Sequence, residues 1–231
     1  MKANFKAVAF DLDGTLYPNY RLNVRLIPFV LRHWRFLAAF GKARTVIRRK
    51  QEQPLTEDDS PFPGFYDYQA RITAEILNAP PDQIKEKINR LIYTGWTPHF
   101  LKIKLFPHVT GILNEFREAK LKMGLLSDFP PRTKLENLGL SGYWDAVLSS
   151  EDFGALKPAR RPFEELARAL DCPAEQILYV GNSRRYDVAG AKRTGMKTAL
   201  KTNRFAVRKS AQIDADLTFH DYRQLHDFVL K

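Results

Sequence analysis

The sequence predicts an α/β fold, a doubly wound, Rossmann-like parallel sheet core with a small inserted α-helical cap domain. Three observations predict it. Short apolar runs alternate with amphipathic stretches over the second half of the 231-residue chain, an order typical of βαβ units. Polar side chains follow directly after several of these runs. Roughly a hundred residues of mainly helical character separate the first apolar run from the second.

The expected strands are short and apolar, as strands that are buried on both faces are. We expect them at residues 6–10, 122–127, 146–148, 177–180, 197–200 and 217–219. Helices are expected at about 162–170 and 186–194, and again after the last strand. Residues 1–16 and 105–231 are therefore predicted to form the core.

Residues 17–104 are predicted to form the helical cap, because their composition differs from that of the core. The stretch 22–50 is basic and apolar and contains no Asp or Glu. A polar, proline-rich and acidic stretch at 51–63 predicts a loop. Two further helices are expected at 65–77 and 81–93.

Composition limits the classes of protein that this chain can belong to. Hydrophobic residues make up 44% and charged residues 27%, which is typical of a soluble globular protein. The net charge of +11 predicts attraction to phosphorylated metabolites, nucleic acid or an acidic membrane surface. Cys172 is the single cysteine, and the first residues lack a signal-peptide layout, so we expect a cytoplasmic protein. The best apolar run, 26–40, is interrupted by charges and predicts no membrane span.

Two carboxylates follow the first expected strand, in a string that contains Asp11, Asp13, Gly14 and Thr15. A carboxylate can attack phosphorus and form an aspartyl-phosphate. A second carboxylate can protonate the leaving oxygen and then deprotonate a water. Clustered carboxylates repel one another, so a hard cation that takes oxygen ligands is expected among them, and Mg²⁺ is the usual one.

Four more polar residues lie at the ends of later strands or in the loops after them. Ser127 ends the second strand and Asp128 follows it, Lys157 precedes a proline, and Asn182 follows the fourth strand. Each has an ordinary structural explanation, since a serine caps helices and a Lys-Pro pair is common in surface turns. In a parallel sheet, however, the carboxyl ends of the strands share one edge, so we expect these side chains to lie close to Asp11.

Taken together, these motifs resemble those of the haloacid dehalogenase superfamily of phosphohydrolases, in order and in strand context, over residues 6–16 and 106–200. The resemblance implies Asp11 as the nucleophile and Asp13 as the general acid and base. It implies a small phosphorylated substrate, bound through Gly14, Thr15, Ser127, Asp128 and Lys157. It also implies a Mg²⁺ site formed by Asp11, the backbone carbonyl of Asp13, Asn182 and Asp187.

One departure from the family pattern is Asn182, because the family usually has an aspartate there. The missing charge predicts weaker Mg²⁺ binding, with Asp187 carrying more of the task directly or through a water. The dehalogenase branch of the superfamily attacks carbon without a metal and also has an asparagine here. It lacks an acid at the position of Asp13, which favours a phosphatase. A phosphomutase outcome and a non-catalytic, regulatory phosphate-binding protein are the remaining alternatives.

The basic stretch at 21–50 allows three interpretations. It can be an amphipathic helix with a solvated basic face, an electropositive lid that attracts an anionic substrate, or a surface for nucleic acid or acidic lipid. The chain contains no recognised nucleic-acid motif, which disfavours nucleic acid without excluding it.

Overall fold

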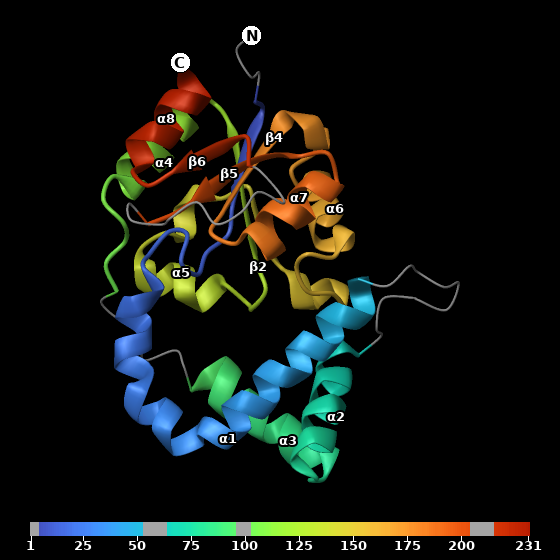
Figure 1. Cartoon of the computed structure of the whole chain (residues 1–231). Helices are drawn as coiled ribbons and strands as arrows, with labels where there is room; N and C mark the ends of the chain where they lie inside the picture. Colours follow the sequence, from blue (N-terminus) through green and yellow to red (C-terminus); the bar gives the residue numbers. More distant parts are fainter. Residues whose placement is uncertain (1–4, 53–63, 96–102, 204–214) are drawn as a thin grey trace.

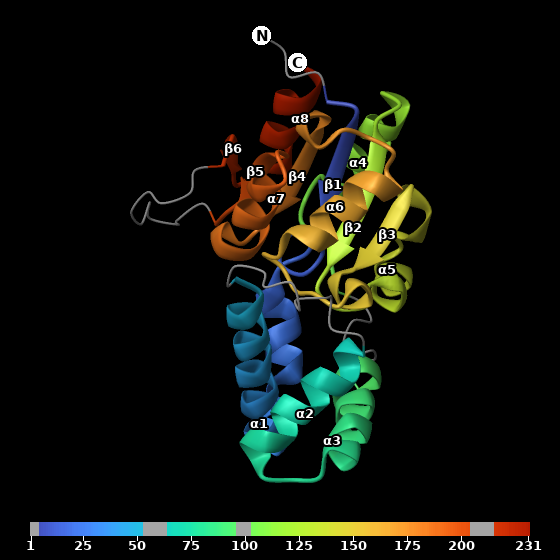
Figure 2. The same cartoon turned by 90° about the vertical axis from the view of Figure 1, so that its right-hand side faces the viewer.

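A computed structural model of the chain describes residues 5–52, 64–95, 103–203 and 215–231. It confirms the predicted fold class, with a parallel sheet flanked by helices and a helical insert beyond one end of that sheet (Figures 1 and 2). The loop expected at 51–63 lies, from residue 53 on, outside the described residues. No helix among the described residues is long and apolar enough to cross a bilayer.

The sheet has six parallel strands in the order β3-β2-β1-β4-β5-β6. They are β1 (Ala7–Phe10), β2 (Lys122–Ser127), β3 (Ala146–Ser149), β4 (Ile177–Gly181), β5 (Lys197–Lys201) and β6 (Leu217–Phe219). Each lies where the sequence predicts a strand, to within one residue at either end.

The winding of the chain reverses beside β1, and this reversal fixes the place of a ligand site. Phe10 pairs with Leu125 of β2 on one side and with Val180 of β4 on the other. The chain runs outward from β1 to β3 and then returns to β4 across β1. The carboxyl ends of β1 and β4 therefore flank the topological switch point, where ligands bind in sheets of this type.

The two faces of β1 carry different side chains. Val8 and Phe10 pack in the larger core cluster, which includes residues of α4 (Val109–Glu118) and α8 (Tyr222–Leu230). Ala7 and Ala9 pack in a second cluster that includes α6 (Arg160–Ala169). A Cβ atom on Gly124 of β2 would lie 2.9 Å from a methyl group of Leu166. Small residues thus let α6 approach the sheet closely.

The remaining core helices are short. They are α5 (Arg132–Leu138), the π-helix η6 (Arg184–Val188), α7 (Ala189–Arg193) and the 3-10 turns Ser141–Tyr143, Ser150–Phe153 and Ala174–Gln176. The helix expected at 186–194 begins two residues earlier, as a π-helix. The side chain of Ser183 caps this start, because its Oγ accepts from the backbone N–H of Tyr186 at 3.1 Å.

The insert consists of α1 (Asn19–Glu52), α2 (Phe65–Leu77), α3 (Pro81–Ile88) and the π-helix η1 (Asn89–Thr94). α1 is bent at His33, whose φ of −121° and ψ of 18° are not helical. The bend divides α1 into a first arm, residues 19–32, and a second arm, residues 34–52, which runs back toward the sheet (Figure 1). No residue pattern predicts this bend, and the division of the chain at residues 17 and 104 stays a prediction.

Candidate active site

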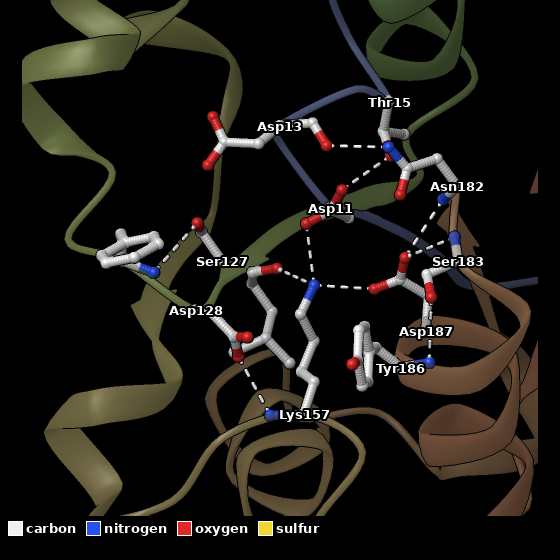
Figure 3. Close-up of polar contacts among 12 residues, drawn as sticks. Asp11, Asp13, Thr15, Ser127, Asp128, Lys157, Asn182, Ser183, Tyr186 and Asp187 are labelled. Atoms are coloured by element: carbon white, nitrogen blue, oxygen red, sulfur yellow. Dashed lines mark hydrogen bonds and ion pairs between the residues drawn. The ribbon is translucent and has the colours of Figure 1, made fainter. Parts of the chain in front are cut away.

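The structure brings the residues singled out by the sequence to one place, at the carboxyl ends of β1, β2 and β4 (Figure 3). Asp11 directly follows β1, Ser127 ends β2 and Asn182 directly follows β4. Lys157 reaches the same place from the loop between β3 and α6. Residues separated by more than a hundred positions therefore share one edge of the sheet, as the βαβ pattern predicts.

A buried triad of charges forms the centre of the site. The Nζ of Lys157 donates to Asp11 Oδ1 and to Asp187 Oδ1, each at 2.7 Å. Burial raises the pKa of Asp11 to about 7, although Lys157 lowers it. Burial also lowers the pKa of Lys157, but the two carboxylates outweigh burial and hold it well above its usual range. Lys157 is therefore a fixed positive charge beside Asp11.

The loop after β1 is shaped by Gly14 and Thr15. The hydroxyl of Thr15 is buried and donates to Asp11 Oδ2 at 2.7 Å, so both oxygens of Asp11 are oriented. Gly14 has a φ of +83°, and a Cβ atom there would lie 2.0 Å from the Asn182 amide nitrogen. Glycine is thus required at this position both for its backbone conformation and for the close approach of the β4 loop.

The backbone carbonyl of Asp13 contacts Asn182, and its carboxylate points away from that contact (Figure 3). Lys134 Nζ donates to Asp13 Oδ2 at 2.6 Å, and the hydroxyl of Tyr17 donates to Asp13 Oδ1. Burial, followed by the charge of Asp13, raises the pKa of Tyr17, so the phenol stays a donor. Sequence reasoning missed Lys134, which lies on α5, because a single lysine on a helix carries no signal of its own.

Ser127 ends β2 and Asp128 follows it, but the two side chains have different surroundings. Ser127 is buried, and its Oγ accepts from the Phe129 N–H at 3.3 Å. Asp128 Oδ1 accepts from the backbone N–H of Lys157 at 2.9 Å, and Oδ2 accepts from Arg48 at 2.6 Å. Burial raises the pKa of Asp128, but the cations beside it outweigh burial and lower it below its usual value. Asp128 therefore joins the Lys157 loop to the insert.

Asp187 orients the loop after β4. Its Oδ2 accepts from the backbone N–H groups of Asn182 at 3.1 Å and of Ser183 at 2.9 Å, while its Oδ1 accepts from Lys157. A Cβ atom on Gly181 would lie 2.3 Å from the Asp187 Cβ, so the carboxylate packs directly against the end of β4. Both of its oxygens are thus occupied by contacts within the protein.

The Asp11 carboxylate and the Asp13 backbone carbonyl are oxygen ligands of the kind that a hard cation takes. The amide of Asn182 lies beside them, and its Nδ2 donates to the Asp13 carbonyl oxygen at 2.8 Å. Rotation of the Asn182 amide by half a turn would exchange its nitrogen for its oxygen, so that the oxygen would be available to a cation. Among the residues that the structure describes, no three His, Cys, Asp or Glu side chains form a metal-holding group. The groups named above, from Asp11, Asp13 and Asn182, include one carboxylate, that of Asp11.

Two arginines of the second arm connect the insert to the core. Arg44 is buried, contacts the carboxylate of Glu151, and lies with its guanidinium 4.1 Å from the centroid of the Phe129 ring. Arg48 donates to the carbonyl of Lys157 at 3.0 Å as well as to Asp128. The remaining described basic side chains of this stretch are exposed, namely Arg25, Arg32, Arg35, Lys42, Arg49 and Lys50.

A cleft of about 720 Å³ opens between the insert and the core. Tyr66 and Tyr93 line it from the insert, and Phe129 and Lys134 line it from the core. Because the ammonium of Lys134 also contacts Asp13, the cleft adjoins the carboxylates of the site. A substrate bound there would have its reacting group close to Asp13.

Comparison with known proteins assigns the chain to a family. A family profile described as "Hydrolase: haloacid dehalogenase-like hydrolase" matches residues 5–195. A glyceraldehyde 3-phosphate phosphatase of Methanopyrus kandleri is 28% identical, over 84% of this chain and 82% of its own.

Two solved structures have the same fold. An L-2-haloacid dehalogenase has a TM-score of 0.68 and 23% identity, over 99% of this chain and 100% of its own. A hydrolase of Bacillus subtilis, solved with bound magnesium, has a TM-score of 0.64 and 15% identity, over 98% of this chain and 99% of its own. At these identities, the two structures show a shared architecture.

Proposed function

The chain belongs to the haloacid dehalogenase-like hydrolases, and we propose that it hydrolyses phosphate monoesters of small metabolites through an aspartyl-phosphate on Asp11. The observation that carries this proposal is the pair of carboxylates in one loop. Asp11 is held 2.7 Å from the fixed cation Lys157, and Asp13 carries a second carboxylate in contact with Lys134. The first suits a nucleophile, and the second suits a group that moves a proton.

In the first step, an oxygen of Asp11 forms a bond to phosphorus while the bond from phosphorus to the leaving oxygen breaks. Lys157 stabilises the negative charge on the phosphoryl oxygens, and the buried Ser127 hydroxyl lies at the end of β2, where it can donate to one of them. Protonated Asp13 gives its proton to the leaving oxygen, so that an alcohol departs rather than an alkoxide.

In the second step, Asp13 accepts a proton from a water molecule. The water oxygen bonds to phosphorus, the bond between phosphorus and Asp11 breaks, and inorganic phosphate leaves. The contact between Lys134 Nζ and Asp13 Oδ2, at 2.6 Å, holds this carboxylate in position for the step. A sugar hydroxyl in the place of water would give the phosphomutase outcome.

The same site can hold magnesium. The carboxylate of Asp11, the carbonyl of Asp13 and the amide oxygen of Asn182 would bind Mg²⁺, which supplies positive charge to the phosphoryl group when bound. We assign Asp187 to orientation of Lys157 and of the Asn182 backbone, because both of its oxygens are already paired there. Magnesium bound at a structural neighbour supports this proposal.

The test is turnover of an aryl phosphate with Mg²⁺, with and without the substitution Asp11→Asn. We expect the variant to lose essentially all activity, because an amide does not attack phosphorus. Asp171→Asn is the matched control, since the Asp171 side chain is 99% exposed, and it should keep full activity. Turnover by Asp11→Asn would refute the mechanism.

Two other results would also refute the proposal. Metal-independent release of halide from a 2-haloacid, without turnover of phosphate esters, would favour the dehalogenase alternative. Tight binding of phosphate without turnover of any phosphorylated metabolite in a broad panel would favour the non-catalytic alternative.

A further inference from the structure

The exposed large apolar side chains of this protein are concentrated in one segment. Every such side chain that the structure records among the described residues lies on the first arm of α1 or just after its bend. They are Tyr20, Val24, Ile27, Val30, Leu31 and Trp34, exposed by 63%, 62%, 51%, 42%, 70% and 61%. We call these six residues the apolar stripe. A concentration of this kind marks a surface that binds something.

The helical spacing shows that packing within the chain does not account for the stripe. Val24, Ile27 and Leu31 follow one another at intervals of three and four residues, which puts them on one face of the first arm. Leu22 and Leu26 on the opposite face are buried and belong to the main core cluster. The arm thus has two apolar faces, and the fold uses only the inner one. Figure 1 shows the arm running along the outer edge of the insert.

The stripe is accompanied by positive charge. Arg32 and Arg35 are exposed on the same stretch of helix, and residues 19–50 contain no Asp or Glu. The whole chain carries a net charge of +11. A partner that covers the stripe therefore needs apolar material for the aliphatic side chains and anions for the arginines.

We propose that the first arm of α1 docks on an acidic lipid membrane surface, lying in the interface without crossing it. Such a surface offers hydrocarbon beneath a layer of anionic headgroups, which matches apolar side chains flanked by arginines. A nucleic-acid backbone offers nothing to Val24, Ile27 and Leu31. Pairing two copies of this arm would bring arginines together with no acid on the arm to neutralise them. The docking does not depend on the proposed catalytic function.

The experiment is sedimentation of the whole protein with vesicles. One set contains equal parts of phosphatidylcholine and phosphatidylserine, and the other contains phosphatidylcholine alone. We expect binding to the acidic vesicles, weakening as salt is raised, and a blue shift of tryptophan emission that Trp34→Phe removes. Each arginine near an acidic surface strengthens binding about fivefold, so Arg32→Gln/Arg35→Gln should weaken it by about 25-fold.

Leu31 provides a matched pair of variants. Leu31→Ser should weaken binding to acidic vesicles about tenfold or more, whereas Leu31→Met keeps the apolar character and should bind like the parent. Because Leu31 is 70% exposed, both variants should keep the parent melting temperature.

Three results would overturn the proposal. They are the absence of binding to acidic vesicles, equal binding to both sets of vesicles, and a dimer in light scattering that Leu31→Ser dissociates while no vesicle is bound. The last result would identify a second copy as the partner of the stripe.

Discussion

Replacement of Glu151 by glutamine tests whether buried charge holds the insert on the core. The side chains of Arg44 and Glu151 are 5% and 0% exposed, and they contact each other across the interface. The hydroxyl of Tyr93 also donates to Glu151 Oε2, at 3.0 Å. Glu151→Gln keeps the shape of the side chain but removes its charge. Arg44 is then left with the Asp128 carboxylate, 3.9 Å away, as its anionic partner.

The expected effect is a loss of about 3 kcal/mol in the free energy of unfolding. Removing one partner of a buried ion pair costs ~3–5 kcal/mol, and the remaining contact with Asp128 places this change at the lower end. At ~2.1 cal/mol/K per residue, unfolding a chain of 231 residues has an entropy of about 0.5 kcal/mol/K. The melting temperature should therefore fall by about 6 °C, because the shift is the free energy divided by this entropy.

Differential scanning calorimetry measures this shift and also shows whether the insert melts separately. The control is Glu164→Gln, because Glu164 pairs with Arg160 at the surface, where an ion pair contributes ~0–1 kcal/mol. Arg44→Met/Glu151→Leu should recover much of the loss, since an apolar pair leaves no buried charge unpaired. If Glu151→Gln and Glu164→Gln have the same melting temperature, the buried ion pair does not hold the insert on the core.

Three further predictions concern the site. Asn182→Asp should lower the Mg²⁺ concentration that gives half-maximal activity by about tenfold, measured by magnesium titration, because it adds a carboxylate to a set that has one. Lys134→Gln should lower kcat by about tenfold or more, because loss of the ammonium leaves the Asp13 carboxylate less firmly held. Lys120→Gln, at an exposed lysine, is the control. Asp128 has a pKa below its unfolded value, so its stabilisation is present above pH ~4 and is lost as pH falls through the folded pKa. Asp128→Asn should flatten this loss in acid-unfolding curves.

The sheet could be predicted from the sequence because its strands are apolar runs with polar residues at their ends. Ala7–Phe10 and Ile177–Gly181 are buried at every position, so neither needed tertiary information to be recognised. The bend of α1 could not be predicted in this way. Pro28, the residue that usually breaks a helix, lies inside the first arm, and the chain departs from helical geometry five residues later, at His33.

The residues of the site could also be predicted from the sequence only in part. Asp11, Lys157 and Asn182 were found because each belongs to a motif beside a strand end. Lys134 contacts Asp13 across 121 positions of sequence, and a lysine at a helical position normally belongs to a solvated face. Its role follows only from the packing of α5 beside the first loop.

The basic stretch at 21–50 illustrates why a run of charge does not have one meaning. From the sequence, its arginines fit a solvated face, a lid or a docking surface, yet in the structure they divide by position on a bent helix. Arg44 and Arg48 of the second arm are paired with core carboxylates at the interface. Arg32 on the first arm remains exposed beside the apolar stripe. Only the bend separates these two environments.

Asn182 and Asp13 bear on the choice between phosphatase and dehalogenase chemistry. They contact each other, but the contact does not involve the Asp13 carboxylate. Asn182, which resembles the dehalogenase pattern, contacts the backbone carbonyl of Asp13. The carboxylate of Asp13, which a phosphatase needs for its leaving group, instead contacts Lys134 and Tyr17. We therefore expect a change at residue 182 to alter the charge available to a cation and to leave the contacts of the Asp13 carboxylate in place. Under the proposed mechanism, Asn182 would set the metal affinity, and Asp13 would transfer the proton to the leaving group.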